Sequence, residues 1–226
     1  FGWSRPASGA ILSGKMKREL FLGALLALAL APAAAAQYPS ALGRSTFVTT
    51  PEGVRIHCYE KGAGPAILFV PGWTMPAEVW GHQIAFFSRN YRVVAMDPRS
   101  QGHSSQPSDG HYPAARARDI KAVVDQLKLT PVTLVGWSMA VTELVSYVDQ
   151  FGNTTVSRLV LVEGIVGGDF DAIATPATLK YASAFQKDRQ KATSEFVRSM
   201  FRKPQSEEYL SRLIADSLQT PTDAAM

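Results

Sequence analysis

Short apolar runs, separated by turn signals, recur along the first two thirds of the chain. Residues 44–49 and 54–60 are typical of two strands, and the Pro51-Glu52-Gly53 break between them predicts a hairpin. Uninterrupted apolar runs are expected where a strand is covered by helices on both faces of a sheet. A run of this kind occupies residues 66–70, and further strands rich in apolar residues are predicted over residues 92–96, 132–135 and 158–162.

Helix-length segments lie between these runs. Residues 76–89 are predicted to be helical, with Val79, Ile84, Phe86 and Phe87 available for the core. A second helix is predicted to begin at Pro113, since proline is favoured in the first turn, and a third covers residues 139–151. Alternating strands and helices indicate an α/β fold with a mostly parallel sheet flanked by helices. Active sites in such sheets lie at the carboxyl ends of the strands.

The pattern changes after Gly164. Gly167-Gly168 predicts a flexible connection, and Thr175-Pro176 predicts a helix start. A single helical face is then traced by Leu210, Leu213, Ile214 and Leu218, and we expect no strand up to Met226. The prediction is therefore a core over residues 37–163 and an all-helical cap over residues 164–226.

The N-terminal segment has the layout of a secretory signal peptide. Lys15, Lys17 and Arg18 precede an apolar run over residues 20–30, and four alanines end at Ala36. The alternative of a membrane helix is disfavoured, because a span needs about 20 apolar residues. We expect a signal peptide over residues 16–36 and upstream or added sequence over residues 1–15. The mature chain would then be exported, periplasmic or secreted, with no stable membrane insertion.

Composition and charge exclude some partners. The chain has 226 residues, of which 46% are hydrophobic and 19% charged, and its net charge is +4. Residues 1–36 hold four basic residues and one acidic residue, so the remainder carries only +1. Nothing in this balance favours nucleic acid as a partner. The single cysteine, Cys58, cannot form an internal disulfide and is expected to be a buried, unreactive thiol.

The candidate chemistry is concentrated in Gly136-Trp137-Ser138-Met139-Ala140, between an apolar run and a helix. A serine between a strand and a helix, with small residues two positions before and after it, is typical of a nucleophile elbow. The alternative is that Ser138 only caps the helix that begins there. In an elbow, the hydroxyl is raised clear of the backbone beside the positive end of the helix dipole.

Four features together resemble the α/β-hydrolase superfamily, in its serine esterase and perhydrolase-like branch with a helical cap. They are the FVPGW segment (69–73), the DPRSQGHS segment (97–104), the elbow, and the helical insertion after residue 162. The resemblance implies that Ser138 is the nucleophile and that the backbone N–H groups of Trp73 and Met139 bind the oxyanion. It implies neither a metal nor a cofactor. Pro71 and Ala140 depart from the family pattern, where histidine and glycine are usual.

The catalytic base and acid are the larger departure. In this superfamily the order is serine, acid, histidine, yet all four histidines, at positions 57, 82, 103 and 111, precede Ser138. We therefore expect a C-terminally truncated hydrolase that lacks its last two core strands and whose histidine and acid lie beyond Met226. Glu163, after the strand that follows the elbow helix, is either the acid or a residue that lines the pocket or anchors the cap. Asp97 is expected to hold its loop through backbone hydrogen bonds.

The activity that the resemblance implies is hydrolysis of a small or medium carboxylic ester through an acyl-enzyme. One alternative is perhydrolysis or carbon–carbon bond hydrolysis with the same serine. Another is a non-catalytic binding protein of the same fold, since a serine without its base is a poor nucleophile.

Overall fold

The computed structural model describes residues 40–167 and 175–225. The predicted upstream segment and signal peptide, residues 1–36, lie outside this part. No helix of the described residues is both long enough and apolar enough to cross a membrane.

A six-stranded sheet forms the centre of the described chain, with strand order β1-β2-β4-β3-β5-β6. β3 is parallel to β4 and to β5, and β5 is parallel to β6, whereas β2 is antiparallel to both of its neighbours. The predicted mostly parallel α/β sheet is therefore confirmed. The strands are β1 Arg44–Thr49, β2 Arg55–Lys61, β3 Ala66–Val70, β4 Arg92–Met96, β5 Val132–Trp137 and β6 Val156–Val162.

Helices and short 3₁₀ turns connect the strands and follow the last of them. The 3₁₀ segments are η1 Ser40–Leu42 and η2 Ala77–Trp80. The helices are α2 Gly81–Phe87, α3 Pro113–Gln126, α4 Ala140–Phe151, α5 Pro176–Lys187, α6 Arg189–Ser199, α7 Glu207–Gln219 and α8 Thr222–Ala225.

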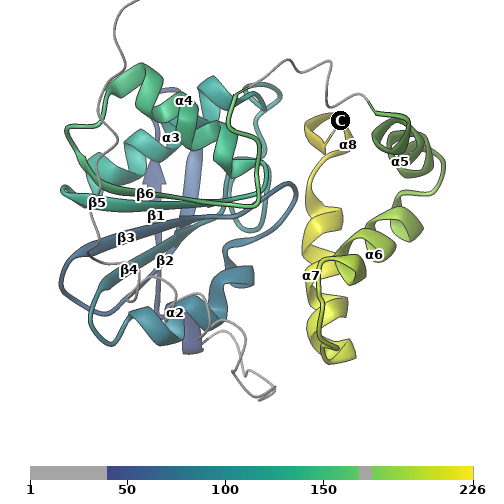
Figure 1. Ribbon diagram of the computed structural model, residues 1–226, viewed down its shortest axis with the longest axis horizontal. Coiled ribbons are helices and arrows are strands. Elements are labelled where there is room, and N and C mark those ends of the chain that lie inside the picture. The colour runs from purple at the N-terminus through teal and green to yellow at the C-terminus, as the bar shows by residue number, and fades with distance from the viewer. Residues whose placement is uncertain (1–39, 168–174, 226) are drawn as a thin grey trace, which may run out of the picture. The chain divides into compact units, whose positions relative to one another are not determined.

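Each face of the sheet is covered by its own helices (Figure 1). Successive side chains of a strand point to opposite faces, so Leu68 packs with α3 and α4 while Phe69 packs with η2 and α2. All five residues of β3 are buried, as the apolar run predicts. The carboxyl end of β5, where Ser138 follows, is thereby held between two packed layers.

The helix predicted over residues 76–89 differs in extent. It is a 3₁₀ turn followed by the short helix α2, which ends at Phe87. Phe86, expected in the core, is exposed, whereas Ile84 and the partly buried Phe87 pack beneath the sheet. Such a short helix presents only one narrow face to the sheet, and neighbouring positions on a helix point about 100° apart.

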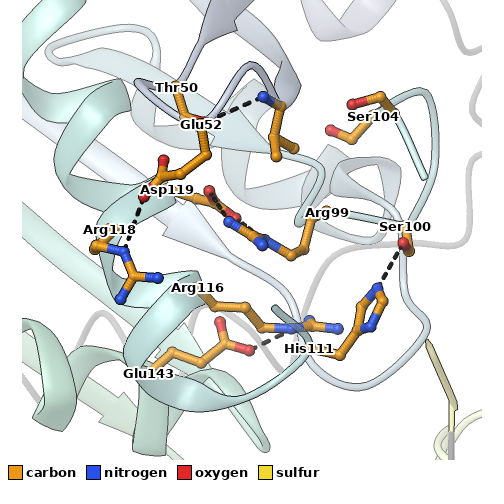
Figure 2. Close-up of polar contacts among 12 residues, drawn as sticks. Thr50, Glu52, Arg99, Ser100, Ser104, His111, Arg116, Arg118, Asp119 and Glu143 are labelled. Atoms are coloured by element: carbon orange, nitrogen blue, oxygen red, sulfur yellow. Dashed lines mark hydrogen bonds and ion pairs between the residues drawn. The ribbon is translucent and has the colours of Figure 1, made fainter. Parts of the chain in front are cut away.

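Two buried ion pairs connect α3 to its surroundings (Figure 2). Arg99, in the loop after β4, donates from Nε and Nη2 to Asp119 of α3, at 2.7 Å in each case. Arg116 of α3 donates to Glu143 of α4 at 3.3 Å. All four side chains are buried, so these pairs tie the loop and both helices together away from solvent.

Only helices follow β6 in the described residues, as predicted. α5 begins at Pro176 with Thr175 as its N-cap, whose side chain accepts from the Thr178 N–H. α6 packs against both α5 and α7. Leu210 and Leu213 of α7 and Val197 of α6 pack against Met75, which lies after β3. Apolar residues of α6 and α7 therefore cover part of the core.

Candidate active site

Ser138 lies at the sharp bend between β5 and α4. Its φ is 58°, in the left-handed region that non-glycine residues rarely adopt. A strained residue of this kind costs about 1–3 kcal/mol and persists only where its surroundings impose it. Here the Ser138 N–H donates to the Val162 carbonyl at 2.9 Å, and the Ser138 carbonyl accepts from the Val141 N–H at 3.0 Å. The bend is therefore fixed from both sides.

Small residues surround the bend because there is no room for a side chain. A Cβ on Gly136 would lie 2.7 Å from Leu144 Cδ1 and 3.0 Å from the Ala140 carbonyl oxygen. A Cβ on Gly164 would lie 2.5 Å from the Ser138 carbonyl oxygen and would overlap Val141 as well. Ala140, unusual at its position, is fully buried. The elbow thus depends on glycines before Ser138 and after β6.

The loop after β3 passes directly beside the serine. A Cβ on Gly72 would lie 3.0 Å from Ser138 Cβ and 3.5 Å from Ser138 Oγ. Within residues 40–167 and 175–225, the backbone N–H groups of Trp73 and Met139 have no hydrogen-bond acceptor. The loop that carries the Trp73 amide therefore lies beside Ser138, and Met139 follows Ser138 in the elbow; these are the two amides predicted as oxyanion donors.

The Trp73 side chain forms an aromatic group with three cap residues. Its ring centroid lies 5.9 Å from that of Tyr181, 5.4 Å from Phe185 and 5.2 Å from Phe196. The Trp73 indole N–H donates to the Ala225 carbonyl at 2.9 Å. A cluster of aromatic side chains from the core and the cap therefore lies at the loop after β3, which passes beside Ser138.

Tyr181 was not selected by the sequence analysis. Its hydroxyl is buried and has no partner among the described residues, and desolvation raises its pKa to about 12. A buried hydroxyl without a partner is uncommon in native proteins and is a candidate contact for a ligand. The spacing of Tyr181 and Phe185 on one face of α5 was the available signal.

Glu163 is the possible acid that the sequence predicts. It follows β6 with a φ of 45°, and its side chain is exposed. In the described chain it makes no hydrogen bond or ion pair, so nothing in these residues couples it to a histidine. Its neighbour Gly164, rather than its carboxylate, contacts the elbow.

None of the four histidines is hydrogen-bonded to Ser138. His57 lies between Asp97 and Ser45, and His111 Nε2 lies 2.9 Å from Ser100 Oγ. His103 makes an edge-to-face contact with the His57 ring, and His82 is exposed on α2. Within the described residues, the Ser138 hydroxyl has no hydrogen-bond partner. A general base for Ser138 is therefore not among the contacts of this part of the chain.

Asp97 holds the loops around it, as predicted. Its carboxylate accepts from the Ala77 N–H at 2.5 Å, the His103 N–H at 2.9 Å and His57 Nδ1 at 2.7 Å. These bonds fix the start of η2 and the loop after β4.

Cys58 is also as predicted: it is fully buried, and burial raises the pKa of its thiol.

Carboxylates gather where α7 meets the core. Arg212 pairs with Glu78 at 2.8 Å, and Ser217 Oγ donates to Thr74 Oγ1 at 2.7 Å. Burial, and then repulsion from Asp97, raises the pKa of Asp216. The charged form of Asp216 is therefore less favourable in the folded protein than in the unfolded chain.

Asp216→Asn is expected to increase stability at pH 7 by up to about 1 kcal/mol, because the side chain is partly exposed and its charge is partly screened. A carboxyl whose pKa is raised on folding favours the native state below its unfolded pKa, and this contribution is lost as pH rises through the folded pKa. The advantage of asparagine should thus shrink between pH 7 and pH 4, as measured by urea denaturation. Asp149→Asn, at an exposed site on α4, is the control, and an advantage that grows on acidification would contradict the prediction.

No group of three or more histidine, cysteine, aspartate or glutamate side chains in residues 40–167 and 175–225 is arranged to hold a metal ion.

Comparison with known proteins identifies the family. The family model of the alpha/beta hydrolase fold matches residues 65–219. A non-heme haloperoxidase of Rhodococcus erythropolis is 37% identical over 120 residues, which are 53% of this chain and 44% of that protein. A bifunctional esterase/perhydrolase of Acinetobacter calcoaceticus is 36% identical over 122 residues, with the same shares.

A solved esterase from Exiguobacterium antarcticum superposes with a TM-score of 0.72 at 25% identity, over 80% of this chain and 70% of that one. The chain aligns with less than half the length of the haloperoxidase and of the esterase/perhydrolase. The matched region contains the sheet from β3 onward, the elbow and the cap helices through α7. The chain belongs to the α/β-hydrolase fold family.

Proposed function

We propose that Ser138 is the nucleophile of a hydrolase that cleaves a small or medium carboxylic ester through an acyl-enzyme. The observation that carries the proposal is the strained bend at Ser138, φ 58°, with the unpaired amides of Trp73 and Met139 in the flanking segments. Strain of this kind is retained where function requires it. The relatives named as esterases support the choice of an ester.

The reaction would follow two displacements. Ser138 Oγ attacks the ester carbonyl carbon, a general base takes the hydroxyl proton, and the carbonyl oxygen becomes an oxyanion between the two backbone amides. The carbon–oxygen bond to the alcohol then breaks, and the alcohol leaves with that proton. Water repeats the sequence on the acyl-enzyme and releases the acid. Loss of one oxyanion donor typically lowers the rate about 10²–10³-fold.

The proposal places the base and the acid in sequence beyond residue 226, because the four histidines of the chain have other contacts or lie away from the serine. Glu163 is the alternative acid within the chain. The aromatic group of Trp73, Tyr181, Phe185 and Phe196 is proposed to contact the acyl or alcohol part of the substrate.

Perhydrolysis is the second candidate, and the relatives named as a haloperoxidase and an esterase/perhydrolase favour it. Hydrogen peroxide would replace water in the second displacement, and a peroxy acid would be released from the acyl-enzyme. Adding peroxide together with an ester and measuring peroxy acid separates this reaction from simple hydrolysis.

Labelling with a fluorophosphonate tests the proposal. The protein is produced from its gene read without interruption past codon 226, and the labelled peptide is identified by mass spectrometry. We expect label on Ser138, and none at that position in Ser138→Ala. A folded, complete protein without label on Ser138 would leave the non-catalytic binding protein as the remaining interpretation.

Replacement of Ser138 by glycine should separate conformation from chemistry. Glycine adopts positive φ without steric cost, so Ser138→Gly is expected to be more stable than Ser138→Ala by about 1 kcal/mol. Both variants should lose the label at position 138. Thermal unfolding measures the difference, and equal stability of the two variants would show that the bend is not strained.

We also propose that residues 16–36 direct export and are removed near Ala36. The N-terminal sequence of the protein recovered from the periplasm or medium tests this, and an intracellular product that retains these residues would contradict it.

A further inference from the structure

Ser45, His57 and Asp97 form a chain of two hydrogen bonds that does not include Ser138. Ser45 Oγ lies 2.8 Å from His57 Nε2, and His57 Nδ1 lies 2.7 Å from Asp97 Oδ2. The three residues come from β1, β2 and the end of β4, which are neighbours in the sheet. Three strands, β2, β4 and β3, separate β1 from β5, which leads to Ser138. The arrangement is therefore independent of the proposed active site.

The hydrogen-bond partners determine the state of the histidine. The Asp97 carboxylate already accepts from the N–H groups of Ala77 and His103, so it acts as an acceptor toward His57 Nδ1 as well. His57 therefore carries a proton on Nδ1, and in the neutral imidazole the lone pair on Nε2 accepts from the Ser45 hydroxyl. This tautomer is the one that can remove a proton from a serine.

The base is buried, whereas the serine is exposed. His57 and Asp97 are each only 1% exposed. The His57 ring packs against Tyr59 at 4.6 Å, His103 at 5.0 Å and Phe47 at 5.1 Å. Ser45, by contrast, is exposed on β1 at the edge of the sheet. An electrophile in solution can thus reach the hydroxyl without entering the core.

The backbone N–H of Ser45 is also available as a hydrogen-bond donor, as the neighbouring strand shows. The His57 carbonyl accepts from Asp97, and the His57 N–H donates to Ser104 Oγ, so both groups point away from β1. In an antiparallel pair the residue opposite, Phe47, then directs its own N–H away from β2, and so does Ser45 two positions earlier. The Ser45 N–H therefore points to the outer edge of β1, where it can stabilise negative charge.

Aromatic side chains flank the hydroxyl. Tyr59 lies directly opposite Ser45 in the strand register, and Phe47, on the same face, is 44% exposed. The Arg55 guanidinium lies 4.4 Å from the centre of the Phe47 ring. Such a surface suits an aromatic group better than an aliphatic chain, since aromatic rings pair with each other and with cations.

We propose that Ser45 is a second nucleophilic serine, which accepts the acyl group of aryl esters with His57 as its base. Ser45 Oγ bonds to the ester carbonyl carbon while its proton moves to His57 Nε2. The bond to the aryl oxygen breaks, and the phenol leaves with the proton from His57. Water, deprotonated by His57, later releases the acid and restores the Ser45 hydroxyl.

Fluorophosphonate labelling of Ser138→Ala tests the proposal, with Ser157 as an internal control. Ser157 is also an exposed serine on a strand, β6, but its hydroxyl partner in the described residues is Thr133, at 3.3 Å. A positioned general base typically contributes 10²–10⁴-fold. Peptide mapping should therefore show label on Ser45 at least about 100-fold faster than on Ser157. Rates at the two serines within about threefold of each other would overturn the proposal.

His57→Gln in the same background gives the second measurement. Glutamine fills similar space but cannot take the proton, so labelling of Ser45 should fall to the rate of Ser157. Near-ultraviolet circular dichroism and cooperative unfolding establish that the variant is folded, and a folded variant that labels Ser45 at the original rate would refute the role of His57. If it does not fold, the comparison of Ser45 with Ser157 in Ser138→Ala still decides.

The substrate class is tested with 4-nitrophenyl acetate. Ser138→Ala should gain one acetyl group on the peptide that contains Ser45, and Ser45→Ala in that background should not. Label from the fluorophosphonate without acetylation by the ester would overturn the assignment to aryl esters. Because these measurements are made in Ser138→Ala, acylation of Ser45 does not depend on whether Ser138 is reactive. The proposal for Ser45 can therefore fail while the proposal for Ser138 holds, and the reverse.

Discussion

Asp119→Ala is expected to lower the free energy of unfolding by about 3–5 kcal/mol, the range for a buried ion pair that loses one partner. Asp119 is 1% exposed and Arg99 is 3% exposed. Both Arg99 donors that face Asp119 would lose their acceptor, and the guanidinium would remain buried with its charge uncompensated (Figure 2). The loss follows mainly from the stranded arginine rather than from the attraction in the intact pair.

Urea denaturation of matched variants measures this effect. Glu52→Ala removes the carboxylate of a pair with Arg118, also on α3, whose side chains are 43% and 38% exposed. That control should lose less than about 1 kcal/mol, since exposed pairs contribute little. The double variant Arg99→Met/Asp119→Leu should recover much of the stability because no charge is left unpaired. Equal losses in Asp119→Ala and Glu52→Ala would refute the argument.

Gly164→Ala is expected to reduce the labelling rate of Ser138 about 100-fold, the size of effect that a displacement of about 1 Å produces. The added methyl group would lie 2.5 Å from the Ser138 carbonyl oxygen and would overlap Val141. Backbone cannot yield as a flexible side chain can, so the elbow itself must move. Overpacking of this kind also destabilises by about 1–3 kcal/mol.

Gly167→Ala is the control for this prediction. Gly167 has a φ of 73°, and a Cβ there would meet no atom within 4 Å. That variant should lose only the backbone contribution, about 1 kcal/mol, and should label at the original rate. A Gly164→Ala protein that labels as fast as the unaltered chain would show that the contact between Gly164 and Ser138 does not position the serine.

Local pattern was sufficient for the strands and for the elbow. The apolar run over residues 66–70 became a fully buried strand, and Pro113 and Thr175-Pro176 start helices where expected. Helical periodicity was less reliable for Phe86, which is exposed because α2 is only seven residues long. The periodicity of so short a helix does not fix which of its faces is buried. Tertiary packing decides that Phe87 rather than Phe86 packs against the sheet.

Part of the candidate active site could also be predicted from local sequence. Ser138 and Met139 are adjacent in sequence, so a motif could select them together. Trp73 came from the resemblance, whereas its contact with Tyr181 and Phe185 depends on a cap more than 100 residues away. No local pattern predicts which rings of α5 meet that tryptophan.

The sequence by itself determined the α/β class, the positions of the strands and the strand–serine–helix bend, because each rests on residues within a few positions of one another. Only the tertiary structure decided how those strands are ordered and which side chains meet across them. His57 was visible as a histidine on an early strand, yet its contacts with Ser45 and Asp97 exist because β2 lies between β1 and β4. Pairing between strands is set by packing of the whole sheet, and the hydrogen bonds that span strands follow from it.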